Sequence, residues 1–295
     1  MPTIDTIGVL GCGLMGSGIA QVAAQAGYRV LVRDTAASQL EKGRISIGKS
    51  TAKLVEKGKL SAADREAALG RLTFVIDLTD LAGCDLIIEA VTEDLALKNE
   101  LWSQLDRLCP PHTIFSSNTS SLTIAAMAAG TSRRDRFAGL HFFNPVPLMP
   151  LVEVVRSIGT SQETIDRLFG FVRRMEKEPV VARDSSGFIV NLLLVPYILD
   201  AIRAVERGVA SVPDIDTAMR LGASHPMGPL TLADFVGLDT LARIGDIMFD
   251  EYREARYAPP PLLRRMVTAG LYGRKSGQGF YDYAKDPPVP VELGL

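Results

Sequence analysis

Short apolar runs alternate with helical patterns through the first two-thirds of the 295-residue chain. A helix is predicted at about Leu14–Ala26, which Gly27 would end as a C-cap, and a long one at roughly Ser38–Lys57. A shorter helix begins at Leu60-Ser61. Because strand and helix patterns alternate, we expect an α/β fold with a doubly wound, mostly parallel sheet covered on both faces. The runs that predict its strands are Ile4–Leu10, Tyr28–Val32, Leu72–Ile76, Leu86–Ala90, Thr113–Phe115, Phe137–Leu140, Leu151–Val155 and Val180–Ala182.

The pattern changes near Asp184, and beyond Gly187 no convincing strand pattern is found until the last few residues. The segment Arg183–Gly187 is therefore the predicted junction between a domain at residues 1–184 and an all-helical domain at residues 185–295. The helices predicted in the second domain are Phe188–Arg207, Val212–Arg220, Leu230–Glu254 and Pro260–Ala269.

Composition narrows the class of protein. The formal net charge is -2, with 22% charged and 47% hydrophobic residues, so no basic field is expected to recruit nucleic acid. No apolar window approaches the length of a membrane span. The chain has three cysteines, Cys12, Cys84 and Cys109, and they form no CxxC pair. An odd number without such a pair argues against a disulfide scaffold or a zinc site and fits a reducing cytoplasm.

A glycine motif follows the first predicted strand and opens the first predicted helix. The sequence Gly11-Cys-Gly-Leu14-Met15-Gly16 has the spacing G-x-G-x-x-G, and Asp34 follows the second strand. Glycines at these positions allow a tight turn, close approach of a pyrophosphate and close packing of helix on strand. With the carboxylate placed for the ribose hydroxyls, the segment predicts a Rossmann-like dinucleotide site at Gly11, Gly13, Leu14, Met15, Gly16 and Asp34.

The residues around Asp34 also bear on the choice of cofactor. A carboxylate repels a 2′-phosphate, so Asp34 favours NAD over NADP. Its neighbour Arg33 is either a solvated surface charge or a group able to turn toward such a phosphate. We therefore predict NAD as the cofactor, with NADP as the alternative.

Lys49, Lys53 and Lys57 are spaced four apart and line one face of the second predicted helix. Like charges at this spacing repel each other and cost helix stability. Their presence is explained either by an anion nearby, such as the phosphates of coenzyme A, or by a solvated helix face. From charge alone the solvated face is the favoured interpretation.

His141 is the candidate base among the three histidines. It ends the apolar run Phe137–Leu140, and ligands bind beyond the carboxyl ends of strands in a doubly wound sheet. A histidine there can take the proton of a substrate hydroxyl, although a lone strand-end histidine is more often structural. Glu153 changes the balance, because a charge inside the strand-like run Leu151–Val155 is expensive unless it is paired. If the two strands are neighbours, Glu153 orients the imidazole; otherwise it is an edge-strand glutamate facing water.

Two further polar features are candidates for substrate binding. Short polar side chains at Ser116–Ser121, including Ser120, follow another strand and can either hydrogen-bond a ligand or cap the next helix. Asn191 interrupts the apolar segment Gly187–Val195 where the helical domain begins, and clefts between domains are common places for sites.

Taken together, these residues resemble the 3-hydroxyacyl-CoA dehydrogenase family, in its short, unfused form similar to bacterial 3-hydroxybutyryl-CoA dehydrogenases. The resemblance runs nearly end to end. It rests on Gly11–Gly18, Ser117–Ser121, Gly139–Pro145, Leu151–Val155, Gly187–Asn191, His225–Pro229 and Gly277–Tyr281.

The resemblance implies interconversion of (S)-3-hydroxyacyl-CoA and 3-ketoacyl-CoA thioesters by hydride transfer to NAD, with His141 as the base oriented by Glu153. It implies that Ser120 and Asn191 bind the reacting part of the substrate, and that the protein is a homodimer through its helical domain. NAD contacts are implied for Glu93, Lys98, Ser120, Asn144 and Lys275, and coenzyme A contacts for Ser50 and Lys57.

Two departures from the family pattern concern local packing rather than the acid–base pair. Leu192 stands where arginine is frequent, and Ser186 where proline is frequent. Chain-length preference is therefore not carried over from the family.

Three other functions were weighed against this one. Related 3-hydroxyisobutyrate and 6-phosphogluconate dehydrogenases place a catalytic lysine on the first helix of the helical domain, and residues 188–207 contain no lysine. A crystallin-like structural or gulonate-oxidising relative lacks the uninterrupted His141–Pro145 run. A protein that only senses NAD has no need of His141 and Glu153 together.

Overall fold

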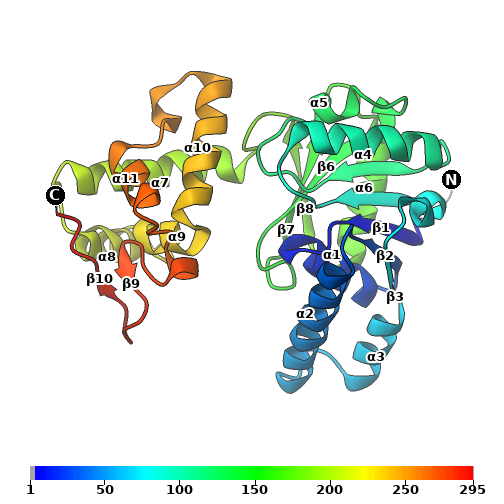
Figure 1. Ribbon diagram of the computed structural model, residues 1–295, viewed down its shortest axis with the longest axis horizontal. Coiled ribbons are helices and arrows are strands. Elements are labelled where there is room, and N and C mark those ends of the chain that lie inside the picture. The colour runs from blue at the N-terminus through cyan, green and yellow to red at the C-terminus, as the bar shows by residue number, and fades with distance from the viewer. Residues whose placement is uncertain (1–3, 295) are drawn as a thin grey trace. The chain divides into compact units, whose positions relative to one another are not determined.

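The structure is a computed structural model that describes residues 4–294. The chain divides into two compact units, the first ending at Phe188 and the second beginning at Ile189 (Figure 1). The sequence predicted a boundary at residue 184, whereas the first unit extends past the last strand of its sheet to Phe188.

One eight-stranded sheet organises the first unit, in the order β3-β2-β1-β4-β5-β6-β7-β8. All eight predicted strands are present, with ends that differ by a few residues from the predicted ones. Their bounds are β1 (Thr6–Leu10), β2 (Arg29–Arg33), β3 (Leu72–Val75), β4 (Leu86–Glu89), β5 (Ile114–Ser117), β6 (Phe137–Phe142), β7 (Leu151–Arg156) and β8 (Glu178–Arg183).

Strands β1 to β6 all run in the same direction. The direction changes only once along the sheet, at the antiparallel pair β6–β7. β8 is parallel to β7. The strand order reverses beside β1, which lies between β2 and β4. In doubly wound sheets ligands bind at such a switch point, beyond the carboxyl ends of the strands.

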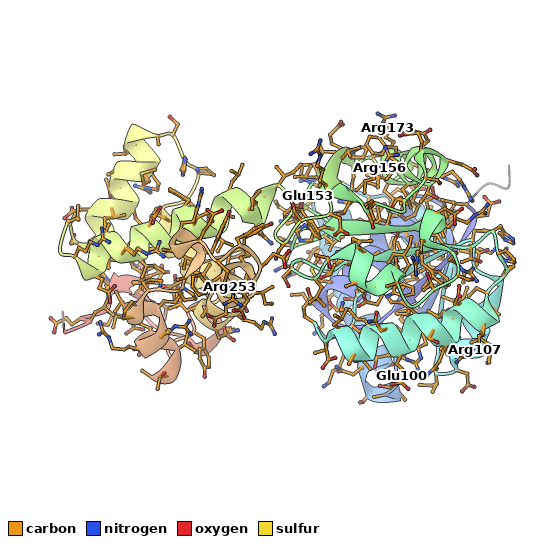
Figure 2. All side chains as sticks on the ribbon, turned by 90° about the horizontal axis from the view of Figure 1, so that it is seen from above. Glu100, Arg107, Glu153, Arg156, Arg173 and Arg253 are labelled. Carbon is orange, nitrogen blue, oxygen red and sulfur yellow. The ribbon has the colours of Figure 1, made fainter. Side chains whose placement is uncertain are left out.

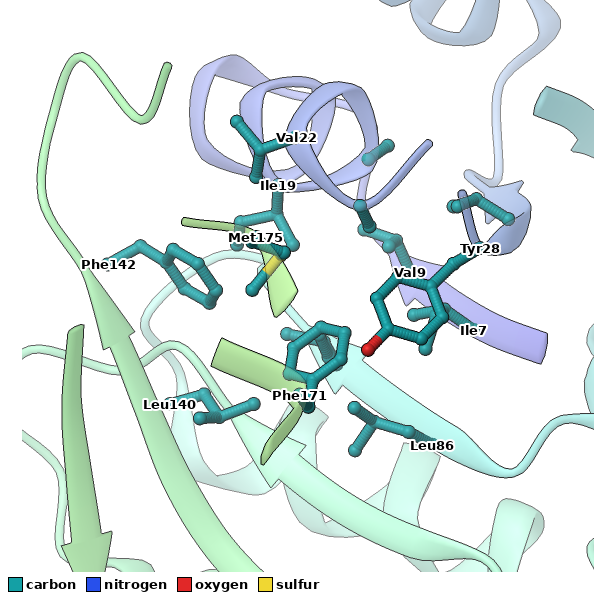
Figure 3. Close-up of a cluster of buried hydrophobic side chains, with 14 of the residues drawn as sticks. Ile7, Val9, Ile19, Val22, Tyr28, Leu86, Leu140, Phe142, Phe171 and Met175 are labelled. Carbon is teal, nitrogen blue, oxygen red and sulfur yellow. The ribbon is translucent and has the colours of Figure 1, made fainter. Parts of the chain in front are cut away.

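Helices cover both faces of this sheet and bury two separate apolar cores. One core joins α1, α2 and α6 to the sheet through side chains such as Ile19, Leu40 and Phe171. Figure 3 shows part of this core, with Ile19 and Phe171 among the labelled side chains. The other joins α4 and α5 to the opposite face through side chains such as Trp102 and Met127. The helices are α1 (Leu14–Gln25), α2 (Ala37–Glu56), α3 (Ala62–Gly70), α4 (Leu95–Leu108), α5 (Ile124–Ala128) and α6 (Gln162–Arg174), with 3-10 turns η1 (Leu78–Gly83) and η2 (Arg134–Arg136).

The second unit is helical, as predicted, with two corrections. The single helix expected at Leu230–Glu254 is two helices, because Gly237 has φ +97° and ends one while beginning the next. A two-residue strand pair, β9 (Tyr281–Asp282) with β10 (Val289–Pro290), also lies in a domain predicted to be all-helical. The helices are α7 (Val190–Glu206), α8 (Val212–Gly222), α9 (Pro229–Val236), α10 (Leu238–Tyr252) and α11 (Pro261–Thr268), with 3-10 turns η3 (Ala255–Tyr257) and η4 (Arg274–Ser276).

A buried aspartate holds the segment Gly277–Tyr281 against α9. Asp234 is 1% exposed and accepts hydrogen bonds from the backbone N–H of Phe280 and Tyr281 and from the hydroxyl of Tyr283. A Cβ on Gly279 would stand 2.0 Å from the Asp234 carboxylate, so only glycine fits there. This sequence motif therefore has a structural explanation.

Residues 4–294 contain neither a membrane-spanning helix nor a metal-binding cluster. In that part of the chain, no helix combines the length and the apolar character that crossing a membrane requires. The same residues contain no group of three or more His, Cys, Asp or Glu side chains arranged to hold a metal ion.

We expect all three cysteines to resist alkylation in the native protein. Burial raises the pKa of Cys12 and Cys109 to about 11 and that of Cys84 to about 12, so the reactive thiolate is scarce. Iodoacetamide labelling followed by mass spectrometry, before and after denaturation, measures this. Rapid labelling of any cysteine in the folded protein would show that the thiol is accessible and contradict the prediction.

Candidate active site

Several of the predicted site residues follow the carboxyl ends of adjacent parallel strands. The order β1-β4-β5-β6 places side by side the ends that lead into the glycine loop, into Glu93, into Ser120 and into the His141 segment. The fold therefore brings candidate site residues from four separate stretches of the sequence to one edge of the sheet.

The glycine loop has the geometry of a phosphate cradle. A Cβ on Gly16 would lie 1.8 Å from the carbonyl oxygen of Gly11, which itself has φ +91°. Gly13 has nothing within 4 Å of its Cβ position and forms the N-cap of α1 without a side-chain hydrogen bond. The first-turn N–H groups of α1 are thus left for an anion, beside Leu14, which is 70% exposed. Met15 turns inward and packs on the core.

We expect Gly16→Ala to weaken NADH binding by at least about tenfold, because the added methyl displaces the Gly11 carbonyl that shapes the cradle. Fluorescence titration with NADH measures the change. Gly48→Ala is the matched control, since a Cβ at Gly48 meets nothing within 4 Å. Wild-type affinity in a folded Gly16→Ala protein would show that the loop is not the cradle.

Asp34 lies beside the glycine loop, as predicted. Its carboxylate accepts a hydrogen bond from the backbone N–H of Cys12 at 2.8 Å. It helps to line a cleft of about 290 Å³ formed by Gly11, Gly13, Arg33, Asp34, Thr35, Gln39, Ala90, Val91, Thr92, Leu97 and Leu101. Arg33 donates from Nε to the carbonyl of Ile76 at 2.9 Å, so its guanidinium is anchored at this cleft. Acid, glycines and apolar side chains together fit the adenosine part of a dinucleotide.

The structure pairs His141 with Glu153. The two residues are directly opposite in the antiparallel register of β6 and β7, and Nδ1 of His141 lies 2.6 Å from Oε2 of Glu153. The imidazole is 6% exposed and the carboxylate 0% exposed. A buried carboxylate at this distance fixes the ring orientation and stabilises a positive charge on it. The strand adjacency on which the prediction depended is confirmed.

Two aromatic rings hold the imidazole in place. The ring of Phe143 lies 4.5 Å and that of Phe188 5.5 Å from the His141 ring, between centroids. Phe188 adopts φ +51°, a strained conformation for a bulky residue, and is 2% exposed. Within residues 4–294, Nε2 of His141 has no hydrogen-bond partner, so this atom is left for a substrate.

The segment after β5 lies close to the strand that carries His141. Oδ1 of Asn118 accepts a hydrogen bond from the backbone N–H of Phe142 at 2.9 Å, which ties the two strand ends together. Ser120 is half-buried in this segment, and its backbone N–H donates to Glu93 at 3.2 Å. Ser186 donates to the carbonyl of Ser121 at 3.0 Å, so the serine found in place of the frequent proline anchors the same segment.

Glu93 and Lys98 form part of a buried ionic group. Nζ of Lys98 lies 3.1 Å from Glu93 and 2.7 Å from Glu89, and the lysine side chain is 1% exposed. Burial raises the pKa of Glu93, but Lys98 and hydrogen bonds from Thr119 and Ser121 outweigh it and hold that pKa below its ordinary value. Glu93 is therefore a fixed anion at the strand ends.

The remaining predicted residues lie elsewhere in their units. Asn144 is exposed in the loop after β6, joined to Pro145 by a cis peptide bond. Asn191 stands in the first turn of α7, and Lys275 donates to Asp239 at 2.6 Å, both within the second unit. Ser50 is half-buried on α2.

The prediction that Lys49, Lys53 and Lys57 line one face of a helix is partly corrected. Lys49 and Lys53 lie on the helix and are exposed, whereas Lys57 is its C-cap rather than a helical residue. In the described part of the chain none of the three forms an ion pair, so all three are available to an anion.

Sequence reasoning missed Glu89 and Phe188, and it included Asn118 in the polar cluster Ser116–Ser121 without giving it a role of its own. A charge inside the apolar run Leu86–Ala90 was the same kind of indication that singled out Glu153, and it identifies Glu89. Phe188 had no comparable indication, because a phenylalanine in an apolar segment is ordinary.

A doubly wound sheet with a glycine cradle after β1, at its switch point, and a carboxylate-held histidine on β6, three strands further along, is typical of dinucleotide-dependent dehydrogenases. Residues 6–185 match the family model for the 3-hydroxyacyl-CoA dehydrogenase NAD-binding domain, and residues 187–283 match the model for the C-terminal domain of the same family. The chain therefore belongs to the 3-hydroxyacyl-CoA dehydrogenase family, and its cofactor is NAD.

Individual relatives agree over almost the full length. The chain is 51% identical over 282 residues to the 3-hydroxybutyryl-CoA dehydrogenase of Mycobacterium tuberculosis, covering 95% of this chain and 99% of that protein. It is 47% identical over 288 residues to the human mitochondrial hydroxyacyl-coenzyme A dehydrogenase, covering 95% and 91%. The solved structure of (S)-3-hydroxybutyryl-CoA dehydrogenase from Ralstonia eutropha is 42% identical and superposes with a TM-score of 0.92, covering 96% and 100%.

Proposed function

We propose that the protein interconverts (S)-3-hydroxyacyl-CoA and 3-ketoacyl-CoA thioesters, with 3-hydroxybutyryl-CoA as the preferred substrate. The observation that carries this proposal is the buried His141–Glu153 pair at the sheet edge that also holds the nucleotide cradle. Family membership and the similarity to 3-hydroxybutyryl-CoA dehydrogenases support the choice of substrate.

In the oxidative direction, Nε2 of His141 removes the proton from the 3-hydroxyl group. The carbon that bears this hydroxyl would lose its hydride at the same time, breaking its C–H bond as the C=O bond forms, and acceptance of that hydride is the chemistry that bound NAD would supply. The imidazolium that results is stabilised by Glu153, whose carboxylate is already 2.6 Å from Nδ1. In the reverse direction His141 returns this proton to the carbonyl oxygen.

Further polar residues from both units bind the substrate and the cofactor in this proposal. Ser120 hydrogen-bonds the reacting oxygen or the carboxamide of the cofactor, and Asn191 contributes its amide to the substrate. Ser50 and Lys57 contact coenzyme A, for which the unpaired ammonium groups along α2 supply an attractive field. Glu93, Lys98, Asn144 and Lys275 complete the NAD contacts; for Lys98, which is 1% exposed, the contribution is made by holding Glu93.

In this proposal residues 1–184 form the NAD-binding domain, which also carries the His141–Glu153 pair. Residues 185–295 form the helical domain, which contributes to substrate binding and forms a homodimer. We place the protein in the cytoplasm, where its three free thiols remain reduced. Light scattering after size exclusion tests the dimer, and a monomer that is fully active would overturn that part of the proposal.

A reduction assay with purified protein tests the function. We expect acetoacetyl-CoA to be reduced faster with NADH than with NADPH, because Asp34 repels a 2′-phosphate while Arg33 is anchored on Ile76. Longer 3-ketoacyl-CoA substrates define the chain-length preference. Equal or faster rates with longer chains would contradict the preference for the butyryl substrate, and a preference for NADPH would contradict the role of Asp34.

A further inference from the structure

Glu89 is a charged residue that the reaction described above does not use. It is the last residue of β4 and is 0% exposed. Three donors converge on its carboxylate: Nζ of Lys98 at 2.7 Å, the backbone N–H of Val91 at 2.7 Å and the hydroxyl of Ser117 at 2.6 Å. Such a fully hydrogen-bonded carboxylate is rigidly held.

The lysine on Glu89 is shared with a second carboxylate. Lys98 also pairs with Glu93, so two acids share one ammonium group; Glu89 and Lys98 are fully buried, and Glu93 is 15% exposed. A buried ion pair is weak evidence for a gain in stability, because the desolvation of its charges offsets their attraction. The role of this group therefore lies in what it positions.

The group positions the Ser120 loop, which we define as residues 117–122. The same oxygen of Glu93 accepts from the hydroxyl of Thr119, from the backbone N–H of Ser120 and from the hydroxyl of Ser121. Glu89 holds the hydroxyl of Ser117 at the start of the loop. Both glutamates thus accept hydrogen bonds from this loop directly, and Lys98 forms an ion pair with each of them.

The backbone of the loop depends on the same side chains. Its N–H groups at Thr119, Ser120, Ser121 and Leu122 donate respectively to Ser117 Oγ, Glu93 Oε1, Thr119 Oγ1 and again Thr119 Oγ1. Four consecutive amides are therefore held by side chains, and those side chains are held by Glu89 or Glu93. Removing one glutamate changes the support of the whole loop.

We propose that Glu89 is a positioning residue that fixes the Ser120 loop, through Ser117 and through Lys98 with Glu93, in the conformation that catalysis requires. The proposal rests on the proposed function in one respect, namely that Ser120 binds the reacting groups. Glu89 itself touches neither substrate nor cofactor in this account.

Hydrogen exchange of the loop amides tests the positioning role without any assay of activity. Glu89→Gln removes the charge that Lys98 and Ser117 bind, and we expect the amides of residues 119–122 to exchange at least about tenfold faster. Glu100→Gln is the matched control, because Glu100 is an exposed glutamate on α4, the helix that carries Lys98 (Figure 2). Unchanged exchange at residues 119–122 in Glu89→Gln would overturn the proposal.

A double-mutant cycle with Ser120→Ala separates positioning from general stability. If Glu89 acts through the loop, Glu89→Gln lowers kcat by about tenfold in the wild-type background but has little further effect once Ser120 is alanine. Additive losses would overturn the proposal. If Ser120→Ala alone leaves kcat unchanged, the role of Ser120 in the proposed function fails, while the exchange measurement still decides the role of Glu89.

A gentler variant keeps the test informative if Glu89→Gln does not fold. Ser117→Ala deletes the hydroxyl that joins Glu89 to the Thr119 N–H and leaves the Glu89–Lys98 pair in place. Faster exchange at residues 119–122 with a wild-type melting temperature supports the proposal. Wild-type exchange there would contradict it.

Discussion

His141→Gln is expected to lower kcat by about 10³–10⁴-fold, because the substitution removes the base that accepts the hydroxyl proton. Glutamine is similar in size and can still reach Glu153, so the strand pair β6–β7 should survive. NADH affinity should also survive, since the glycine loop and Asp34 are untouched. Steady-state rates and NADH titration on the same preparation measure both effects.

The control for this variant is His112→Gln. His112 is a loop histidine whose side chain is 43% exposed, so the same substitution there should leave turnover unchanged. Near-normal turnover in a folded His141→Gln protein would mean that another group supplies the base, and the proposed mechanism would fail.

Glu153→Gln is expected to have the second largest effect, a loss of about 10³-fold in kcat with a changed pH–rate profile. A neutral amide at 2.6 Å from Nδ1 no longer stabilises the imidazolium, and it can impose the wrong tautomer on the ring. Because Glu153 is 0% exposed, its replacement removes a buried charge, and the melting temperature must be measured alongside the rate.

Glu178→Gln provides the comparison, since Glu178 begins the neighbouring strand β8 and is exposed. It should change neither rate nor pH dependence. If Glu153→Gln loses activity only in proportion to its loss of folded protein, the carboxylate is structural and does not orient the base.

The sheet was predictable because strands that are buried on both faces require apolar residues at successive positions, so each strand appears in the sequence as a short apolar run. The break at Gly237 was not predicted, because a single glycine inside an apolar helical pattern is compatible with an uninterrupted helix. The direction of individual strands could not be predicted from the hydrophobic pattern either, because an apolar run looks the same in both directions. The structure shows that β7 is antiparallel to β6.

For the site, a charge in an apolar strand was the most informative local feature. It identified Glu153 as the partner of His141, and the same reasoning applied to Leu86–Ala90 identifies Glu89. For Lys98, by contrast, no local feature of the sequence indicated its partners. Sequence resemblance gave it a contact with NAD, whereas its place between two carboxylates depends on tertiary packing that no local pattern records.

The most direct test of the central claim is the rate of NADH oxidation when acetoacetyl-CoA is added to the purified wild-type protein. We predict rapid, saturable loss of NADH absorbance that is abolished in His141→Gln. A folded protein that binds NADH but oxidises none with acetoacetyl-CoA or any longer 3-ketoacyl-CoA would contradict it.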